Sequence, residues 1–218
     1  SPLSSPLHFP ALLPSPPPLS LPSTSYTQTE PSKATRRRLG HLTATSVAVA
    51  LGGFHTCAVL ADSTCKCWGK NTFGQLGYDR SDELGDASGE MAALQSVDLG
   101  SGATVVAVDA GYTSTCALLH GGSVKCWGNG DAGRLGLDSK VDQGDSAGEM
   151  AALPAVNLGA SATAISVGGK HACAILSGGN LKCWGYNAYG QLGYDSNVNV
   201  GGSSGDMAAL QSVNLGAG

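Results

Sequence analysis

Short runs in which apolar side chains alternate with other residues recur along the chain from residue 46 onward. The first run places Val47, Val49 and Leu51 two residues apart and is broken by Gly52. A period of two with branched side chains predicts a β-strand. Equivalent runs occur twice more, at Val106, Val108 and Ala110 before Gly111, and at Ile165 and Val167 before Gly168. The pattern therefore predicts a strand at the start of each of three units.

The stretch that follows each predicted strand is a repeated sequence. It reads HTCAVLADSTCKCWGKNTFGQLG from His55, STCALLHGGSVKCWGNGDAGRLG from Ser114 and HACAILSGGNLKCWGYNAYGQLG from His171. The first cysteines of successive copies are 59 and 57 residues apart. A repeat near this length indicates one supersecondary unit that has been copied and stacked.

The rest of each unit supplies the remaining predicted elements. The repeated stretch contains a hairpin and ends in a glycine-rich turn, which a polar loop connects to MAALQSVDLG or a close variant. Leu94, Val97 and Leu99 suit a last strand, although MAAL alone also suits a helical turn. About four strands per unit are typical of a β-propeller blade. We therefore expect an all-β fold, an incomplete β-propeller of about three four-stranded blades in an open arc, over residues 46–218.

Residues 1–45 have a different composition. Nine of the ten prolines lie between Pro2 and Pro31, and three arginines follow at 36–38. This composition predicts a disordered Pro/Ser-rich tail, with a Pro-rich docking ligand or a basic patch as alternatives. Because the chain opens on Ser1 and its end repeats the residues that precede the second unit, we expect a fragment of a longer reading frame. No apolar run approaches the ~18 residues of a transmembrane helix, so no membrane span is expected.

The cysteines of each hairpin can be placed by counting from its turn. His120-Gly121-Gly122 fits a three-residue turn, and counting outward from it pairs Cys116 with Cys126. The same count gives the pairs Cys57–Cys67 and Cys173–Cys183. At such a non-hydrogen-bonded site the α-carbons lie ~4.5 Å apart, within the ~4.4–6.8 Å that a disulfide accepts. We expect a disulfide in each blade and hence an extracellular or secretory compartment; reduced buried thiols are the alternative.

The sequence offers two candidates for metal binding, which are Cys65 and the acidic loops. Cys65 aligns with Val124 and Leu181, so we expect a core residue there, with a reactive thiol as the alternative. No C-x-x-C pair accompanies it, which argues against zinc. The acidic loops resemble calcium ligands in composition, but they lack EF-hand spacing, and Gly202 stands where the other copies have aspartate. We therefore expect no metal and no cofactor.

Histidine and tryptophan recur with the cysteines. His55 stands beside Cys57, but the second copy has Ser114 in place of the histidine. A nucleophile and its base are needed once, in a cleft, so these repeated residues are interpreted as structural and no catalytic residue is assigned. The tryptophans of the KCWG segments are expected to pack blade against blade rather than to form a ligand cage. They are Trp68, Trp127 and Trp184.

The charge of the repeat region limits the class of partner. Residues 46–218 contain 8 basic and 15 acidic residues. A nucleic-acid-binding face needs clustered lysine and arginine, so no nucleic acid partner is expected. An acidic surface permits a basic protein partner. The partner that we expect is therefore an unidentified protein, of basic character if the acidic loops bind it.

The combination HTCAVL…KCWGKNTFGQLG resembles the repeat of the regulator-of-chromosome-condensation family, especially its cysteine-containing secreted-type variants. The resemblance covers about residues 46–218, in three copies. It implies blades of a seven-bladed β-propeller. Family members include exchange factors for a small nuclear GTPase that contact histones, ubiquitin-ligase modules, photoreceptors and inhibitors of secreted β-lactamases. Three copies cannot close such a ring, and the loop insertion of the exchange factors is not recognisable here, so no site residue is carried over.

What these family members share is a rigid disc that binds another protein, with the specific partner set by loops. The sequence therefore predicts a non-catalytic protein-interaction scaffold. One alternative is a guanine-nucleotide exchange regulator of a small GTPase. Another is an extracellular enzyme inhibitor or lectin-like binder.

Overall fold

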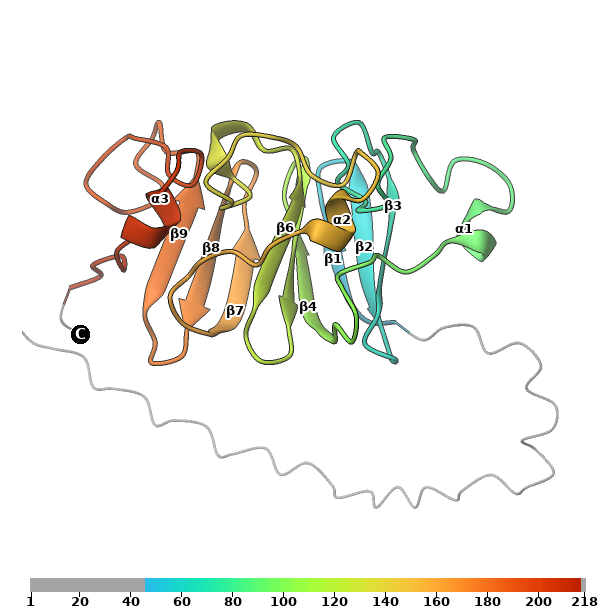
Figure 1. Ribbon diagram of the computed structural model, residues 1–218, viewed down its shortest axis with the longest axis horizontal. Coiled ribbons are helices and arrows are strands. Elements are labelled where there is room, and N and C mark those ends of the chain that lie inside the picture. The colour runs from blue at the N-terminus through green and yellow to red at the C-terminus, as the bar shows by residue number, and fades with distance from the viewer. Residues whose placement is uncertain (1–45, 217–218) are drawn as a thin grey trace, which may run out of the picture. The chain divides into compact units, whose positions relative to one another are not determined.

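The computed structural model describes residues 46–216. The predicted disordered tail, residues 1–45, lies outside these residues and stays a prediction. Within the described part, the chain forms three antiparallel sheets that are connected by loops and short helices (Figure 1). The all-β class expected from the alternating pattern is confirmed.

Each sheet consists of three strands that follow one another in the chain. The strands are β1 (Ser46–Leu51), β2 (His55–Leu60) and β3 (Cys65–Gly69) in the first sheet, β4 (Val105–Ala110), β5 (Ser114–Leu119) and β6 (Val124–Gly128) in the second, and β7 (Ala162–Val167), β8 (His171–Leu176) and β9 (Leu181–Gly185) in the third. The strand order in every sheet is the chain order, as in a β-meander.

The turn between the second and third strands fixes the register of each hairpin. Gly122 has a φ of 87° and Gly179 a φ of 85° in two of these turns, a conformation that glycine adopts without a steric penalty. Ser63 takes the same place in the first hairpin, with a φ of 65°. All three turns give one register, which sets Cys57 opposite Cys67 in the first blade. The predicted pairing is therefore confirmed, including the hairpin without the glycine.

The expected count of four strands per blade is corrected to three. The segment that carries Leu94, Val97 and Leu99 is irregular, although all three side chains are buried. It makes one backbone hydrogen bond to the neighbouring strand, from the Val97 N–H to the Cys65 carbonyl at 2.8 Å. The apolar pattern of this segment thus records burial against the blade and not a ladder of strand pairing.

Short helices precede these irregular segments, as the MAAL sequence also allowed. They are α1 (Glu90–Ala93), α2 (Glu149–Ala152) and α3 (Asp206–Ala209). A 3₁₀ turn, Asp131–Gly133, lies in the loop after β6. Each α-helix follows a glycine in the left-handed conformation, which turns the polar loop into the helix.

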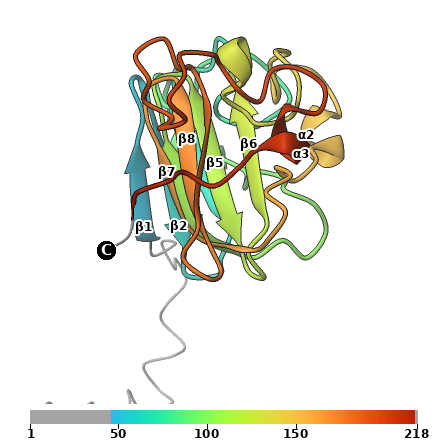
Figure 2. The same cartoon turned by 90° about the vertical axis from the view of Figure 1, so that its left-hand side faces the viewer.

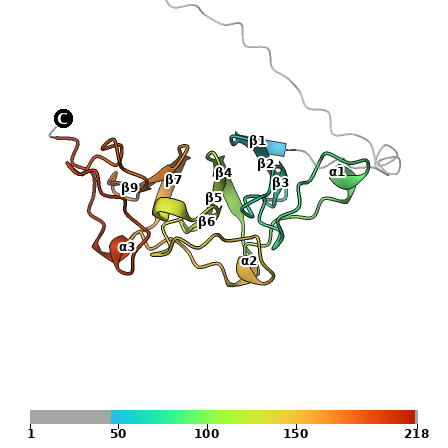
Figure 3. The same ribbon diagram turned by 90° about the horizontal axis from the view of Figure 1, so that it is seen from above.

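The three sheets stand side by side along an arc (Figures 1 and 3). The first strand of each sheet lies on one side of the arc, and helices α1, α2 and α3 lie on the opposite side (Figure 3). Seen from one end of the arc, the sheets stack one behind another (Figure 2). This is the arrangement of successive propeller blades in an open arc.

Apolar side chains fill the space between neighbouring sheets. One buried cluster joins the first and second blades and includes Val59, Leu76, Val108, Trp127 and Met150. A second cluster joins the second and third blades and includes Leu118, Leu135, Val156, Trp184 and Met207. Because each cluster draws on two blades, a blade in this chain buries its faces mainly against its neighbours.

Candidate functional site

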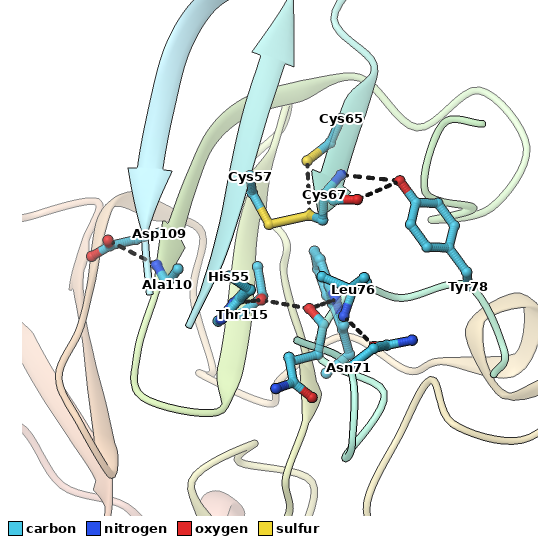
Figure 4. The surroundings of a disulfide bond; sticks show 12 residues. His55, Cys57, Cys65, Cys67, Asn71, Leu76, Tyr78, Asp109, Ala110 and Thr115 are labelled. Carbon is cyan, nitrogen blue, oxygen red and sulfur yellow. Dashed lines mark hydrogen bonds between the residues drawn. A yellow bond between two sulfur atoms is a disulfide. The ribbon is translucent and has the colours of Figure 1, made fainter. Parts of the chain in front are cut away.

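The cysteine pairs lie inside the hairpins. The structure joins Cys57 to Cys67 as a disulfide whose α-carbons are 4.1 Å apart (Figure 4). The equivalent disulfides are Cys116–Cys126 and Cys173–Cys183. Each disulfide cross-links the second and third strands of its own blade. The six sulfur atoms are therefore not available as nucleophiles.

Cys65 lies beside the first disulfide but has no partner of its own. Its Sγ is 3.9 Å from the Sγ of Cys67, and the side chain is buried as expected from its alignment with Val124 (Figure 4). Burial raises the pKa of the Cys65 thiol to about 12, so the reactive thiolate is scarce at neutral pH. The sulfurs of Cys57, Cys65 and Cys67 gather within 4.8 Å, but the disulfide leaves one thiol, which is too few ligands for zinc.

His55 takes part in a hydrogen-bond chain between the first two blades. Thr115 donates its hydroxyl hydrogen to the carbonyl of Gln75 at 2.8 Å, so His55 Nε2 donates to the Thr115 Oγ1 at 2.8 Å. Burial lowers the pKa of His55 to about 4, which keeps the ring neutral. His55 therefore holds two blades together, and its neighbour Cys57 is already in a disulfide.

The tryptophans of the second and third blades pack against the preceding blade. Trp127 and Trp184 are 0% exposed. Trp127 donates its indole N–H to the Gln75 carbonyl at 3.0 Å, and Trp184 donates to the Arg134 carbonyl at 3.1 Å. Gly77 lies so close to the first indole that an added Cβ would be 2.8 Å from Trp127 Nε1. The positions of these two side chains agree with the predicted blade packing.

An aspartate clasp, which the sequence analysis did not identify, fastens each blade to the next. Asp79 accepts hydrogen bonds from the N–H groups of Gly148 at 2.9 Å and Met150 at 2.8 Å. Asp138 accepts the equivalent bonds from Gly205 and Met207 at 3.0 and 2.8 Å. The signal was present in the sequence, because an aspartate follows the glycine-rich turn at the same place in all three copies.

Other loop carboxylates bind the backbone of their own loops. Glu90 accepts from the N–H groups of Ala87 and Gly85, which lower the pKa of its carboxyl group. Glu149 and Asp206 do the same in the other blades, with three N–H donors each. These recurring carboxylates order the loops, which is a sufficient reason for their presence without calcium.

Hollows lie beside the loops that lead into helices α1 and α3. We call the surface formed by these loops and the equivalent loop before α2 the loop side of the arc. One of about 500 Å³ in the first blade is lined by Tyr78, Asp79, Glu90 and Leu94 among others. Another of about 500 Å³ in the third blade is lined by the equivalent Tyr194, Asp195, Asp206 and Leu210. Because the same hollow recurs in two blades, it belongs to the repeat and does not mark a unique active site.

Three further acidic side chains lie in the loop of the first blade. Asp82, Glu83 and Asp86 are all exposed there. Together the three loops at 78–93, 137–152 and 194–209 contain eleven acidic and two basic residues. Exposed carboxylates in a shared set of loops form a surface of negative potential, which attracts basic groups.

Stacked hairpin sheets with these interblade contacts define the class of β-propeller repeat proteins. Residues 47–75, 105–134 and 162–191 each match the regulator of chromosome condensation (RCC1) repeat. The chain therefore belongs to the RCC1-repeat proteins, as its sequence indicated. Within the described residues, no helix is long and apolar enough to cross a membrane.

Curated relatives contain this region as a part of longer chains. The probable E3 ubiquitin-protein ligase HERC3 of Homo sapiens is 33% identical over 169 residues, which are 77% of this chain and 15% of the relative. The ultraviolet-B receptor UVR8 of Arabidopsis thaliana is 33% identical over 152 residues, which are 67% of this chain and 30% of the relative. The chain thus spans less than a third of each of these relatives.

Solved structures show the same fold. Human WBSCR16 superposes with a TM-score of 0.59 at 19% identity, over 79% of this chain and 38% of that chain. Prp20p of Saccharomyces cerevisiae, which was described with its binding to Gsp1p and histones, gives a TM-score of 0.58 at 17% identity over 78% and 38%. At this identity the likeness establishes the β-propeller arrangement and not a shared activity.

Proposed function

We propose that this chain is a non-catalytic protein-interaction module whose contact surface is the loop side of the arc. The proposal rests on the observation that the polar and sulfur-containing side chains that recur in the repeats already make structural contacts within the fold. The hairpin cysteines are in disulfides, His55 and the buried tryptophans bind carbonyl or hydroxyl groups between blades, and Glu90 and its equivalents bind backbone N–H groups. What is left for a partner is shape and surface charge.

The charge of the exposed loop supports a basic partner. Asp82, Glu83 and Asp86 are exposed in one loop, residues 78–93, in which Arg80 is the one basic residue. Prp20p, a structural neighbour, was described with its binding to histones, which are basic proteins. The proposal does not extend the ligase activity named for HERC3 to this chain, since the chain covers 15% of that protein.

The disulfides support a compartment for this interaction. Three cross-strand disulfides in one small arc are typical of proteins in oxidising environments. We therefore assign the interaction to the extracellular space or the secretory pathway. In that setting the histones in the test below serve as a basic probe and not as the physiological partner.

Binding to immobilised core histones, measured as a function of salt, tests the proposal. Replacing the three exposed carboxylates together (Asp82→Asn, Glu83→Gln, Asp86→Asn) should weaken binding about tenfold at low salt and flatten its salt dependence. Asp62→Asn, which removes a carboxylate at a hairpin turn of the same blade, is the control and should leave binding unchanged. Equal binding by all variants would contradict the loop surface, and accelerated nucleotide release from Gsp1p would contradict the non-catalytic assignment.

A further inference from the structure

The outer face of the first blade is uncovered where the equivalent face of the second blade is buried. Met91 is 46% exposed, whereas Met150, its equivalent, is 1% exposed. Leu51 is 73% exposed, whereas its equivalent in β4, Ala110, is 6% exposed. No described blade packs against this face of the first blade. It is equivalent to the face that the second blade packs against the first. We call this the leading face.

The third blade leaves the opposite half-interface uncovered, which we call the trailing face. Ile175 is 44% exposed at the position where Val59 of the first blade is 1% exposed. Asp195 is exposed and has a φ of 50°, close to the 56° of Asp79. Asp79 uses that conformation to clasp the next blade. In the described part of the chain, Asp195 has no such N–H groups to bind.

The two uncovered faces complement each other residue by residue. The first internal interface joins His55, Gln75 and Asp79 of one blade to Thr115, Trp127 and Met150 of the next. The trailing face carries the same three residue types at the equivalent positions, as His171, Gln191 and Asp195. The leading face carries the other three, as Thr56, Trp68 and Met91.

This agreement exceeds what the fold requires. The second internal interface is also well packed, but it has Ser114 and Ala172 where the first has histidine and threonine, and Arg134 where the first has Gln75. The sheet arrangement therefore tolerates substitutions at these positions. The trailing and leading faces nevertheless hold the complete set of the first interface, split between the two ends of the arc.

We propose that the trailing face of one copy of this chain docks onto the leading face of a second copy. In that junction Asp195 accepts from the N–H groups of Gly89 and Met91 of the second copy. Trp68 of the second copy donates its indole N–H to the Gln191 carbonyl, beside the exposed Gly193, whose equivalent Gly77 lies against an indole. His171, Thr56 and the Gln191 carbonyl form the third contact, as His55, Thr115 and Gln75 do within the chain.

For the 218-residue chain the proposed occupant is a second copy, because its two uncovered faces carry the complementary halves of the first internal interface. A head-to-tail contact of this kind generates rings or open chains of copies. Asp82 should stay exposed in the junction, as its equivalent Val141 is, whereas Glu83 and Asp86 should become partly buried, as Asp142 and Asp145 are. The two proposals are tested separately, because self-association is measured without a basic partner and histone binding is measured at a concentration where the chain is monomeric.

Sedimentation velocity of the 218-residue chain over a range of concentrations tests the junction. The wild-type chain should form larger species as its concentration rises. Asp195→Lys on the trailing face and Met91→Glu on the leading face should each weaken association at least about tenfold, because each removes or opposes charge-assisted hydrogen bonds. Asp131→Lys, which changes an exposed aspartate of the middle blade in the same way, should associate as the wild type does.

Mixing the two deficient variants identifies the geometry. The Met91→Glu chain keeps an intact trailing face and the Asp195→Lys chain keeps an intact leading face, so the mixture should form a one-to-one heterodimer and stop there. Circular dichroism and thermal unfolding of each variant establish that it is folded. A chain that stays monomeric at every concentration, or dimers of either variant alone that equal those of the wild type, would overturn the proposal.

Discussion

Trp127 and Trp68 occupy the same position in neighbouring blades, yet their surroundings differ. Trp127 is fully buried and donates to a carbonyl of the preceding blade, whereas Trp68 is only partly buried, because no described blade precedes its own. The comparison shows that a repeated side chain stabilises this fold only where a neighbouring blade meets it. At the ends of the arc the same residue types become surface.

Truncating these two tryptophans gives the largest expected contrast. Trp127→Ala should lower the free energy of unfolding by ~3–5 kcal/mol, because it leaves a cavity between two blades. Trp68→Ala should cost less than half of that, since its indole already meets solvent. Urea denaturation measures both. A loss below ~0.5 kcal/mol for Trp127→Ala, which is typical of surface positions, would contradict the blade interface.

The histidine between the first two blades predicts a dependence of stability on pH. Burial lowers the pKa of His55 in the folded chain to about 4, so between pH 6.5 and 4 the unfolded chain binds a proton that the folded chain does not. Stability should therefore fall as the pH falls through this window, by roughly 2–3 kcal/mol between pH 7.5 and 4.5.

His55→Ser isolates this effect, since the second blade has serine at the equivalent position. The variant should be less stable at neutral pH but should lose less stability on acidification than the wild-type chain. The carboxylates titrate in both proteins, so the difference between the two curves reports His55. Parallel curves would show that the histidine is not buried as a neutral ring.

The aspartate clasps allow a matched pair of substitutions. Asp138→Ala removes the acceptor for two N–H groups of the third blade and should cost about 1–3 kcal/mol. Asp195→Ala, measured at a concentration where the chain is monomeric, removes no hydrogen bond to another described blade. It should therefore lower the free energy of unfolding only by its backbone effect, to within about 0.5 kcal/mol. Both residues have positive φ, 53° and 50°, so that backbone effect is common to the two variants. Equal destabilisation would mean that the clasp contributes nothing.

Cys65 should give the smallest effect. Cys65→Val places the residue of the equivalent position, Val124, in the same buried site and should change stability by less than about 1.5 kcal/mol. Thiol titration of the wild-type chain, unfolded without reductant, should find one thiol, because six of the seven cysteines are paired. Six or seven thiols would remove the disulfides and the compartment that rests on them.

The repeat carried most of what could be predicted from the sequence. Aligning three copies placed the hairpins, and counting from the turn glycines set Cys116 opposite Cys126. This succeeds because turn type fixes register locally, within a dozen residues. The outer segment with Val97 was misassigned as a strand because an apolar pattern reports burial and not hydrogen bonding.

The contacts between blades were harder to predict. Asp79 lies in a polar loop, and its partners Gly148 and Met150 are about seventy residues away in the chain. Its recurrence in all three copies distinguishes it from Asp82, which aligns with Val141 and Val198, but recurrence does not say what the carboxylate binds. The distinction depends on which carboxylate meets backbone N–H groups of the next blade, and that is set by the stacking of blades.

Hydrogen exchange of three equivalent amides tests most directly the claim that repeated residues acquire their role from a neighbouring blade. The amides are those of Met91, Met150 and Met207, measured in the Asp195→Lys chain so that no second copy covers the leading face. The N–H groups of Met150 and Met207, which donate to Asp79 and Asp138, should be protected, and that of Met91 should exchange much faster. Equal protection of all three amides would contradict the account.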